Sequence, residues 1–336
     1  MIATQTTVAS GFGQEGLESF LAGTDEPAWL SALRRDAWER FQNLPWPSRS
    51  DEEWSRTDIR LFRLTDFKPP TRAVDDRNDL GPRATPLLTE GVDRGGSVST
   101  FQGWPGESWL KPAWAEQGVR FGSLNACVAA APDLLRPYLE QPLIPADTDR
   151  FAALQSAFWM GGALLYVPAR VVIDQPLHVI SELADGGVDL SRLLVILEEG
   201  AEATLLTELE SCDVRGRGLH CGAVEIHLAP RARLRFVSLQ NWNKDVWHFA
   251  HHKAVVGRDA SLQWTSGALG SRLSKVNQHV ALVGPGAESQ VNGVLFTEGK
   301  QHLSYHTLQH HRAPHGRSDF LYKAALQDES RTVWRG

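Results

Sequence analysis

Histidine is concentrated in one stretch of this sequence. Eleven of its twelve histidines lie from His220 onward. Residues 302–315 hold the densest group, which comprises His302, His306, His310, His311 and His315. Imidazole is the commonest metal ligand among side chains, and it changes charge near neutral pH. The cluster therefore predicts either a metal site or a set of polar side chains on a sheet face or subunit contact.

The spacing of these histidines gives different answers on a helix and on a strand. On a helix His302, His306 and His310 would stack one turn apart. On a strand they would share a face, but each would lie ~13 Å from the next because four residues separate them. No pair of histidines one residue apart with a nearby glutamate follows, as a cupin-like metal enzyme would need. A strand favours a polar face or subunit contact, and a histidine-dependent metal-binding enzyme on a β-scaffold stays as the alternative.

A second group of histidines, His248, His251 and His252, lies near Asn241 and Asp245. Nothing in its spacing defines a coordination geometry. We expect these side chains to lie on the surface or on a face of the β-structure.

Motifs for nucleotide and hydrolytic chemistry are missing from the sequence. It contains neither the G-x-x-x-x-G-K-[ST] phosphate loop nor the G-x-S-x-G nucleophile elbow. Scattered Asp and Glu do not define a carboxylate pair for glycoside hydrolysis. We therefore predict no catalytic residues and no enzymatic activity, and any use of ATP must come from a partner.

Composition excludes several classes of partner. The formal charge is -6, from 34 basic and 40 acidic residues, and no run of like charges could bind nucleic acid or an anionic membrane. The three cysteines form no C-x-x-C pair, which favours a reducing cytoplasm. No secretory signal is visible, and the longest apolar stretch, near residues 158–168, is shorter than the ~20 residues of a membrane span. We expect a soluble cytoplasmic protein.

Helical patterns dominate the first half of the sequence. Leu30, Leu33, Ala37 and Phe41 recur at helical spacing after Pro27, which predicts a helix that ends near residue 45. Further helical patterns cover residues 122–139 and 149–158, and residues 68–96 form an irregular linker rich in Pro, Asp, Arg and Gly. We assign residues 1–160 to a mostly helical amino-terminal region.

From residue 161 onward the sequence indicates strands. Short aliphatic runs are bounded by Pro, Gly or Asp, as is typical of strands. A corner between strands recurs at Ala201, Ala232, Ala260 and Ala287, with separations of 31, 28 and 27 residues. A nearly constant period favours a β-helix, in which each unit covers its neighbour, over a series of hairpins joined by the same corners. We place this β-helix core at residues 161–336.

Several segments resemble one known family. Residues 318–336, SDFLYKAALQDESRTVWRG, resemble the core signature of the SufB/SufD family of the SUF iron-sulfur cluster assembly system. Within that family they resemble the SufD branch most closely. Residues 29–58, 151–176 and 293–299 resemble the amino-terminal region, the start of the core and an inner repeat of the same family. The resemblance spans nearly all of the chain.

The resemblance implies a mainly β protein, with a right-handed parallel β-helix core preceded by an α-helical region. It implies a non-enzymatic SufD-like scaffold or accessory subunit that pairs with a SufB-like paralogue and a SufC-like ATPase. A homodimer is a further assembly that stays open. No cofactor is expected to bind this chain stably, and an iron-sulfur cluster would touch it only transiently in the complex.

The resemblance breaks at two places. In some family members a histidine stands just before the lysine of the signature. That histidine is proposed to act in cluster formation at the contact between SufB and SufD. Here Tyr322 takes its position, before Lys323. A phenol with a pKa near ~10 is a poorer iron ligand at neutral pH than imidazole. We therefore expect Tyr322 and Lys323 to mark a subunit interface, with the histidines of residues 302–315 as the other candidates for cluster assembly.

The second break is the end of the sequence. Family members continue past this arginine-glycine with more β-helix and a helical tail that resembles the docking site for SufC. The chain is therefore expected to be truncated, with an incomplete core and without the SufC docking region. An uncapped last rung exposes apolar surface and unpaired backbone groups, so we expect lower solubility than in an extended chain.

Overall fold

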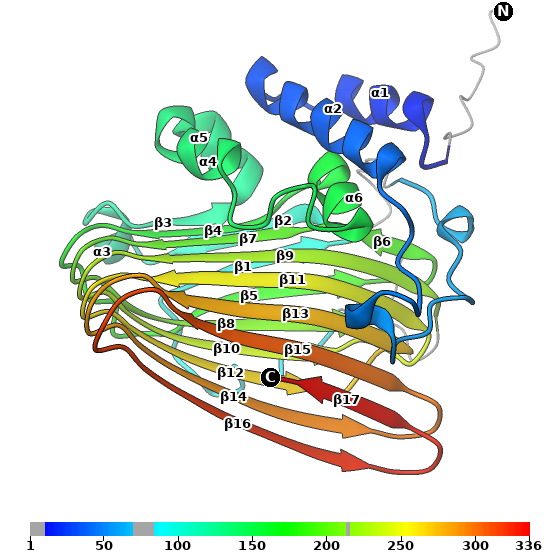
Figure 1. Ribbon diagram of the computed structural model, residues 1–336. Helices are drawn as coiled ribbons and strands as arrows, with labels where there is room; N and C mark the ends of the chain where they lie inside the picture. The colour runs from blue at the N-terminus through cyan, green and yellow to red at the C-terminus, as the bar shows by residue number, and fades with distance from the viewer. Residues whose placement is uncertain (1–10, 70–83, 213–215) are drawn as a thin grey trace, which may run out of the picture.

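The computed structural model describes residues 11–69, 84–212 and 216–336, and it shows a two-sheet parallel β-solenoid with helices along one side (Figure 1). The solenoid has about six turns. The helices are α1 (Gln14–Ala22), α2 (Ala28–Asn43), α3 (Pro112–Ala115), α4 (Leu124–Ala130), α5 (Pro132–Glu140) and α6 (Arg150–Phe158), with short 3₁₀ turns η1 (Glu52–Trp54) and η2 (Leu64–Asp66). The mainly β fold with amino-terminal helices confirms the prediction.

Two sheets alternate along the chain. The first has the order β16-β14-β12-β10-β8-β5-β1-β2, and the second has the order β17-β15-β13-β11-β9-β7-β4-β3, with β6 beside β9. The strands of the first sheet are β1 (Gly96–Phe101), β2 (Trp104–Leu110), β5 (Leu177–Leu183), β8 (Glu202–Ser211), β10 (Arg233–Asn241), β12 (Ser261–Ala268), β14 (Glu288–Thr297) and β16 (Arg317–Leu326). Those of the second are β3 (Arg120–Ser123), β4 (Gly162–Val167), β6 (Gly187–Asp189), β7 (Arg192–Leu197), β9 (Gly218–Leu228), β11 (Val246–Val256), β13 (Leu273–Leu282), β15 (His302–His311) and β17 (Arg331–Arg335).

The pairing between successive turns is parallel from β5 and β4 onward, so the hairpin alternative is wrong. Among the described strands, only the pairs β1 with β2 and β3 with β4 are antiparallel. These first strands already belong to the two sheets, and therefore residue 161 does not separate a helical part from a β part. Short strands with weak periodicity gave no sign that residues 96–123 would join the solenoid. Of the irregular linker near 68–96, residues 70–83 lie outside the described part.

The repeated corner explains the period. Ala201, Ala232, Ala260 and Ala287 are fully buried in one core cluster, where a larger side chain would not fit beneath the next turn. A residue with positive φ stands just before each alanine, namely Gly200, Arg231, Asp259 and Gly286. Each alanine carbonyl accepts a hydrogen bond from the next turn, as in Arg233 N to Ala201 O at 2.8 Å. The corner is thus one structural unit repeated in register.

The interior between the sheets is apolar along the half nearest these corners. Leu177, Leu205, Phe236 and Trp264 are register partners on successive strands of the first sheet and are buried together with Ile226 and other side chains of the second sheet. Alternation along each strand sends every second residue inward, so an inward apolar position repeats at the same level from turn to turn. This stack forms the largest core of the described residues.

The helices cover the outer face of the second sheet over its early turns (Figure 1). Phe151 and Phe158 of α6 pack in one cluster with Trp247 and Phe249 of β11. The helix predicted to end near residue 45 is α2, and the patterns of residues 122–139 and 149–158 correspond to α4, α5 and α6. No helix in the described ranges is long and apolar enough to cross a membrane.

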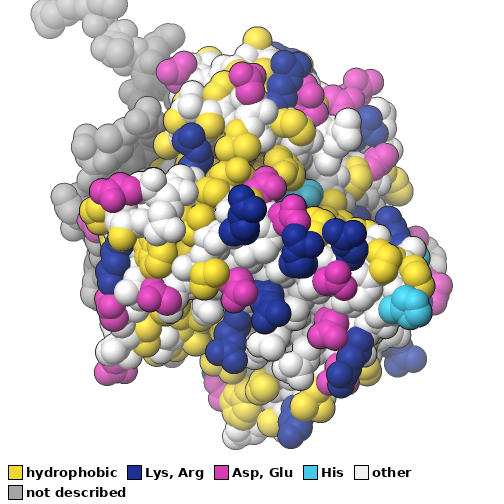
Figure 2. All heavy atoms as spheres, turned by 90° about the vertical axis from the view of Figure 1, so that its left-hand side faces the viewer, with side chains coloured by type: hydrophobic (Ala, Val, Ile, Leu, Met, Phe, Trp, Pro, Cys, Tyr) yellow, Lys and Arg dark blue, Asp and Glu magenta, His cyan; other side chains and the backbone are white. Residues whose placement is uncertain are grey.

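The corner end of the solenoid carries mixed charge. Figure 2 looks at this end and shows basic and acidic side chains interspersed. Arg231 pairs with Glu199, and Arg233 lies 3.8 Å from Glu202 across adjacent turns. This mixture agrees with the absence of a single-sign surface for nucleic acid.

Candidate interaction site on the terminal turns

The five clustered histidines are distributed over β15 and the corner that follows it. Leu303 and Tyr305 point into the core, so alternation sends His302, His306 and His310 to the outer face of the second sheet. His311 falls on the inner side. The strand reading of this segment is therefore confirmed, and the three even-numbered histidines share a face but are spread along it.

His315 belongs to the series of corners. Its φ is +60°, and it precedes Gly316 as Arg231 and Asp259 precede Ala232 and Ala260. Its side chain is exposed. The position therefore has a conformational explanation, because the corner requires a left-handed residue whatever its chemistry.

The two remaining exposed histidines of this cluster, His310 and His311, each contact a residue nearby in the sequence. Arg312 Nε donates to His310 Nδ1 at 3.2 Å, and His311 Nε2 lies 2.8 Å from Ser318 Oγ of β16. Both imidazoles are exposed. They lie on opposite faces of β15 and so do not converge on one point.

His306 and Lys275 form the best-defined polar contact on the outer face. Lys275 Nζ donates to His306 Nδ1 at 2.9 Å and to the backbone oxygen of Glu53 at 3.0 Å, and it lies 5.5 Å from the ring of Trp54. Burial, followed by the charges of Lys275 and Arg335, lowers the pKa of His306 to about 4. Burial also lowers the pKa of Lys275 to about 8. At neutral pH the imidazole is thus a neutral acceptor for the ammonium group.

Sequence reasoning missed Lys275. The available signal was a lysine inside an otherwise uncharged strand-like run, but its partner carbonyl is 222 residues away in η1. η1 is a single 3₁₀ turn whose N-cap residue, Asp51, makes no side-chain cap hydrogen bond. Instead Ser48 N donates to Asp51 Oδ2 at 2.7 Å.

A second polar chain begins at α6. Asp149 Oδ1 accepts from Ala152 N at 2.8 Å and caps the helix, while Oδ2 lies 3.0 Å from His251 Nε2. Asn277 Nδ2 donates to His251 Nδ1 at 3.4 Å. Burial favours a raised pKa for Asp149, but His251 and the backbone donors outweigh it and lower the pKa. This arrangement orients the imidazole, as in an Asp-His dyad, but among the described residues no hydroxyl or thiol is hydrogen-bonded to it.

The other two histidines of that group point inward. His248 Nδ1 and His220 Nδ1 lie 2.8 Å apart on adjacent strands, and the rings stack with centroids 4.7 Å apart. His252 stacks on Trp264, with centroids 5.6 Å apart. Burial lowers the pKa of His220 and of His252 to about 3, so both are neutral inside the solenoid. The prediction placed His248, His251 and His252 on the surface or on a face of the β-structure. All three lie on faces of β11, with His251 on the outer face and His248 and His252 on the inner one, and none is exposed.

Tyr322 and Lys323 lie on opposite sides of β16. Tyr322 points inward, donates to Gln278 Oε1 at 2.6 Å and stacks on Trp334 with centroids 5.6 Å apart. Burial raises the pKa of its phenol well above the ordinary value. Lys323 is exposed on the outer face. The two residues are therefore adjacent in sequence but cannot act on one ligand on the same face.

Metal binding is limited by this distribution. Among the described residues, no group of three or more His, Cys, Asp or Glu side chains is arranged to hold a metal ion. His302 illustrates the reason, since it is half-buried beneath the helical region and its Nε2 has no partner in the described ranges. The alternative of a histidine-dependent metal enzyme gains no support from this geometry.

These observations define the class of the molecule. It is a parallel β-solenoid in which the inward-facing His220, His248 and His252 stack on neighbouring rings, while His310, His315 and Lys323 are exposed on the last turns. Such an architecture offers repeated surfaces for protein contacts.

The comparison with known proteins identifies the family. A family model described as "SUF system FeS cluster assembly, SufBD core domain" matches residues 179–336, and the "SufBD protein N-terminal region" matches residues 98–179. The chain belongs to the SufB/SufD family of iron-sulfur cluster assembly proteins. The boundary between the two matches falls inside β5, so both matched regions contribute to the solenoid.

Curated relatives agree with this assignment. An "Iron-sulfur cluster assembly SufBD family protein" of Staphylococcus epidermidis is 28% identical over 323 residues, which cover 93% of this chain and 68% of the relative. Relatives of the same description in Staphylococcus haemolyticus and Staphylococcus aureus are 27% identical over the same shares. The similarity therefore includes the amino-terminal helices as well as the solenoid.

Proposed function

We propose that this chain is a SufD-like scaffold subunit without catalytic activity of its own, which pairs with a SufB-like paralogue and works with a SufC-like ATPase. The family assignment supports a role in iron-sulfur cluster assembly. The observation that carries the pairing is a group of exposed apolar side chains on the outer face of the first sheet, Val294 and Phe296 of β14 and Leu321 of β16.

Two adjacent strands contribute to this apolar group. Val294 is 55% exposed, Phe296 41% and Leu321 52%, and Lys323, the register partner of Val294, is exposed beside them. Contiguous exposed apolar side chains next to a polar group are typical of protein contacts.

A scaffold role is also supported by the chemistry of the polar groups. Lys275, His306 and Asp149 are each held by protein contacts that stabilise the junction between helices and solenoid. The sequence contains no phosphate loop, which assigns ATP hydrolysis to another subunit. A cluster would contact this chain only during its assembly in the complex, with Tyr322, Lys323 and the exposed histidines nearest to the contact.

Co-purification tests this proposal. The chain is co-expressed with the SufB-like paralogue and the SufC-like ATPase of the same genome, and an affinity tag on the paralogue is used for recovery. Leu321→Asp places a charge among these apolar side chains and is expected to lower recovery at least ~10-fold. Val172→Asp is the matched control, because Val172 is also 52% exposed but lies among the early turns. Its recovery should equal that of the parent.

Two results would contradict the proposal. If the folded parent chain is never recovered with the paralogue, the pairing is absent. If Leu321→Asp is recovered as well as the parent, the apolar group around Leu321 is not the contact.

A further inference from the structure

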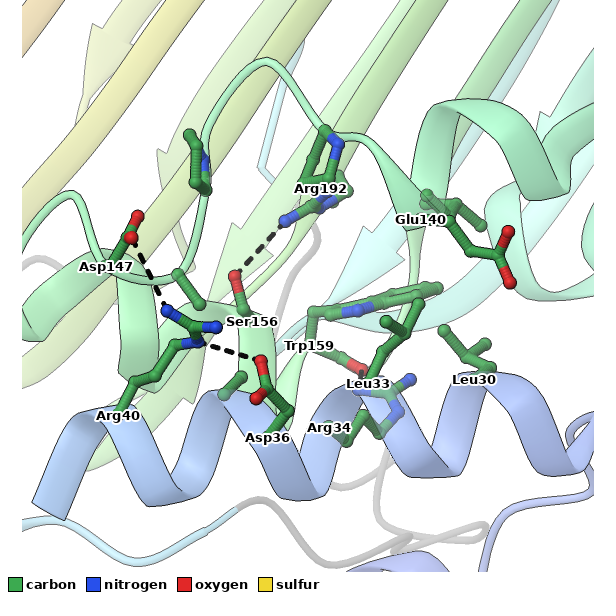
Figure 3. Close-up of a pocket in the computed structure, with 15 residues that line it drawn as sticks. Leu30, Leu33, Arg34, Asp36, Arg40, Glu140, Asp147, Ser156, Trp159 and Arg192 are labelled. Atoms are coloured by element: carbon green, nitrogen blue, oxygen red, sulfur yellow. Dashed lines mark hydrogen bonds and ion pairs between the residues drawn. The ribbon is translucent and has the colours of Figure 1, made fainter.

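A pocket lies between the helices and the solenoid, away from the terminal turns (Figure 3). It has a volume of about 190 Å³ and is enclosed by α2, by the connection from α5 to α6, and by the start of β7. Leu33 and Trp159 form part of its apolar wall. The polar groups that line it include two buried arginines, Arg34 and Arg192.

Arg192 comes from the first residue of β7 and is 3% exposed. Its Nη1 donates to Glu225 Oε1 at 2.9 Å, and its Nη2 donates to Gln155 Oε1 at 3.1 Å and to Ser156 Oγ at 3.4 Å. Its Nε is buried and has no acceptor in the described ranges. One N–H of this cation is therefore unsatisfied.

Arg34 comes from α2 and is fully buried. Its Nε donates to both oxygens of Glu26 at 3.0 Å, its Nη1 donates to Trp159 O at 2.7 Å, and its guanidinium carbon lies 4.3 Å from the centroid of the Trp159 ring. Its Nη2 has no acceptor within the described part of the chain. Burial lowers the pKa of Arg34 to about 10, and the charge of Arg192 contributes in the same direction.

Two guanidinium groups with unused donors thus line one cavity. A buried donor without an acceptor costs stability, and the cost is larger for a charged group. Guanidinium matches the geometry of carboxylate and phosphate oxygens. We propose that this pocket binds a small oxyanion, a carboxylate or phosphate group, with Arg192, Ser156 and Arg34 as its donors.

The rim of the pocket can open without cost to the core. Arg40 bridges Asp36 at 2.8 Å and Asp147 at 3.4 Å across one side (Figure 3). These side chains are 43%, 55% and 61% exposed, and ion pairs so exposed contribute little to stability. Both unused donors are covered by their neighbours, so binding also requires the two guanidinium planes to turn toward the cavity.

The remaining acidic groups around the pocket already have cationic partners. Glu26 and Glu225 accept from Arg34 and Arg192, and Glu140 of the wall accepts from Arg136 Nε at 2.8 Å. The pocket therefore offers unused hydrogen-bond donors, whereas the carboxylate acceptors around it are already paired. This difference favours an anion over a metal cation, and it does not depend on the proposed pairing with a paralogue.

Calorimetric titration of the whole chain tests the site. Inorganic phosphate and acetate are titrated separately at pH 7.5, with ionic strength held constant by sodium chloride. We expect saturable binding of at least one of them, with a dissociation constant between ~10 µM and ~5 mM, because so few atoms limit affinity. Binding of phosphate alone assigns a phosphoryl ligand, and binding of acetate alone assigns a carboxylate.

Ser156→Ala removes one donor without leaving a buried charge unpaired, and it should weaken binding about 5-fold. Arg35→Gln is the control, because Arg35 is 52% exposed beside Arg34 but pairs with Glu18 outside the pocket. Its affinity should match that of the parent. The proposal is overturned if neither anion binds more than chloride does, or if Arg35→Gln weakens binding as much as Ser156→Ala.

Discussion

The covered turns of this solenoid, β7 to β12, and its terminal turns, β14 to β17, are built on the same repeat but differ in their surroundings. In β9 nearly every residue is buried, whereas in β16 none is fully buried. Both have the same parallel register and the same left-handed corner. The repeat thus decides the backbone path, and the neighbours of each turn decide which side chains remain free to bind.

The difference extends to chemistry. In the covered turns, ionisable groups are paired inside the protein, as in Arg192 of β7 with Glu225 of β9 at 2.9 Å. In the terminal turns, Lys323 and His310 are exposed. Breaking a buried pair leaves an uncompensated charge, whereas an exposed group can exchange partners freely. This contrast is the reason to look for the partner contact at the terminal turns.

Tryptophan truncation should give the largest contrast between the two regions. Trp264 is fully buried in β12, with its ring 5.0 Å from that of Phe236, so Trp264→Ala should lower the free energy of unfolding by ~3–5 kcal/mol. Trp334→Ala, at 47% exposure in β17, should cost less than ~1 kcal/mol. Urea unfolding followed by circular dichroism measures both. Equal losses would mean that the terminal turns are packed as tightly as the covered ones.

Acid should act mainly through the covered turns. The pKa of His252 falls to about 3 in the folded chain, below the ordinary ~6.5 of the unfolded chain, so the unfolded state binds the extra proton. This contribution is fully present above pH ~6.5 and is lost as pH falls toward 3, by ~1.4 kcal/mol per pH unit. Between pH 6.5 and 5, His252→Gln should lose ~2 kcal/mol less stability than the parent.

The control for this experiment is His310→Gln, an exposed position in β15. Unfolding midpoints in urea at the two pH values should fall as much for this variant as for the parent. If His252→Gln shows the parent's full acid sensitivity, the imidazole inside the solenoid is not the group that titrates.

The smallest effect concerns the last corner. His315→Gly should leave stability unchanged or raise it by ~0.5–1 kcal/mol, because glycine adopts the φ of +60° without the penalty of a Cβ atom. His311→Gly should instead lower stability by a similar amount. His311 is the last residue of β15, and its side chain contacts Ser318 on the inner side. Thermal midpoints compare the two. A clear loss for His315→Gly would indicate a contact of the imidazole beyond its role in the corner.

Sequence patterns predicted the solenoid from particular residues. The alanine corners at 201, 232, 260 and 287 gave the period, and alternation placed His302, His306 and His310 on one face. These signals are local, since each depends on neighbours within one turn. The same local reasoning left the start of the sheets at residue 161, because β1 and β3 join the sheets through distant partners. Gly96 of β1 pairs with Leu177 of β5, 81 residues away, and the partners in β3 and β4 are 40 to 46 residues apart.

The candidate sites were less predictable. Lys275 acquires its role from Glu53 and His306, and Arg34 acquires its role from Trp159, 125 residues away. Tyr322 and Lys323 were grouped as neighbours in sequence, yet the pleat sends them to opposite faces. None of these relations produces a spacing that sequence inspection can recognise.

The sequence by itself determined the period of the solenoid, the family and the strand context of the histidines, because these properties repeat in every turn or persist along a segment. Only the tertiary structure decided which titratable groups are neutral inside the solenoid, which are paired beneath the helices and which remain exposed on the terminal turns. Burial and partner choice depend on segments that fold back from far along the chain, and the same imidazole or guanidinium changes its chemistry with the neighbours it meets.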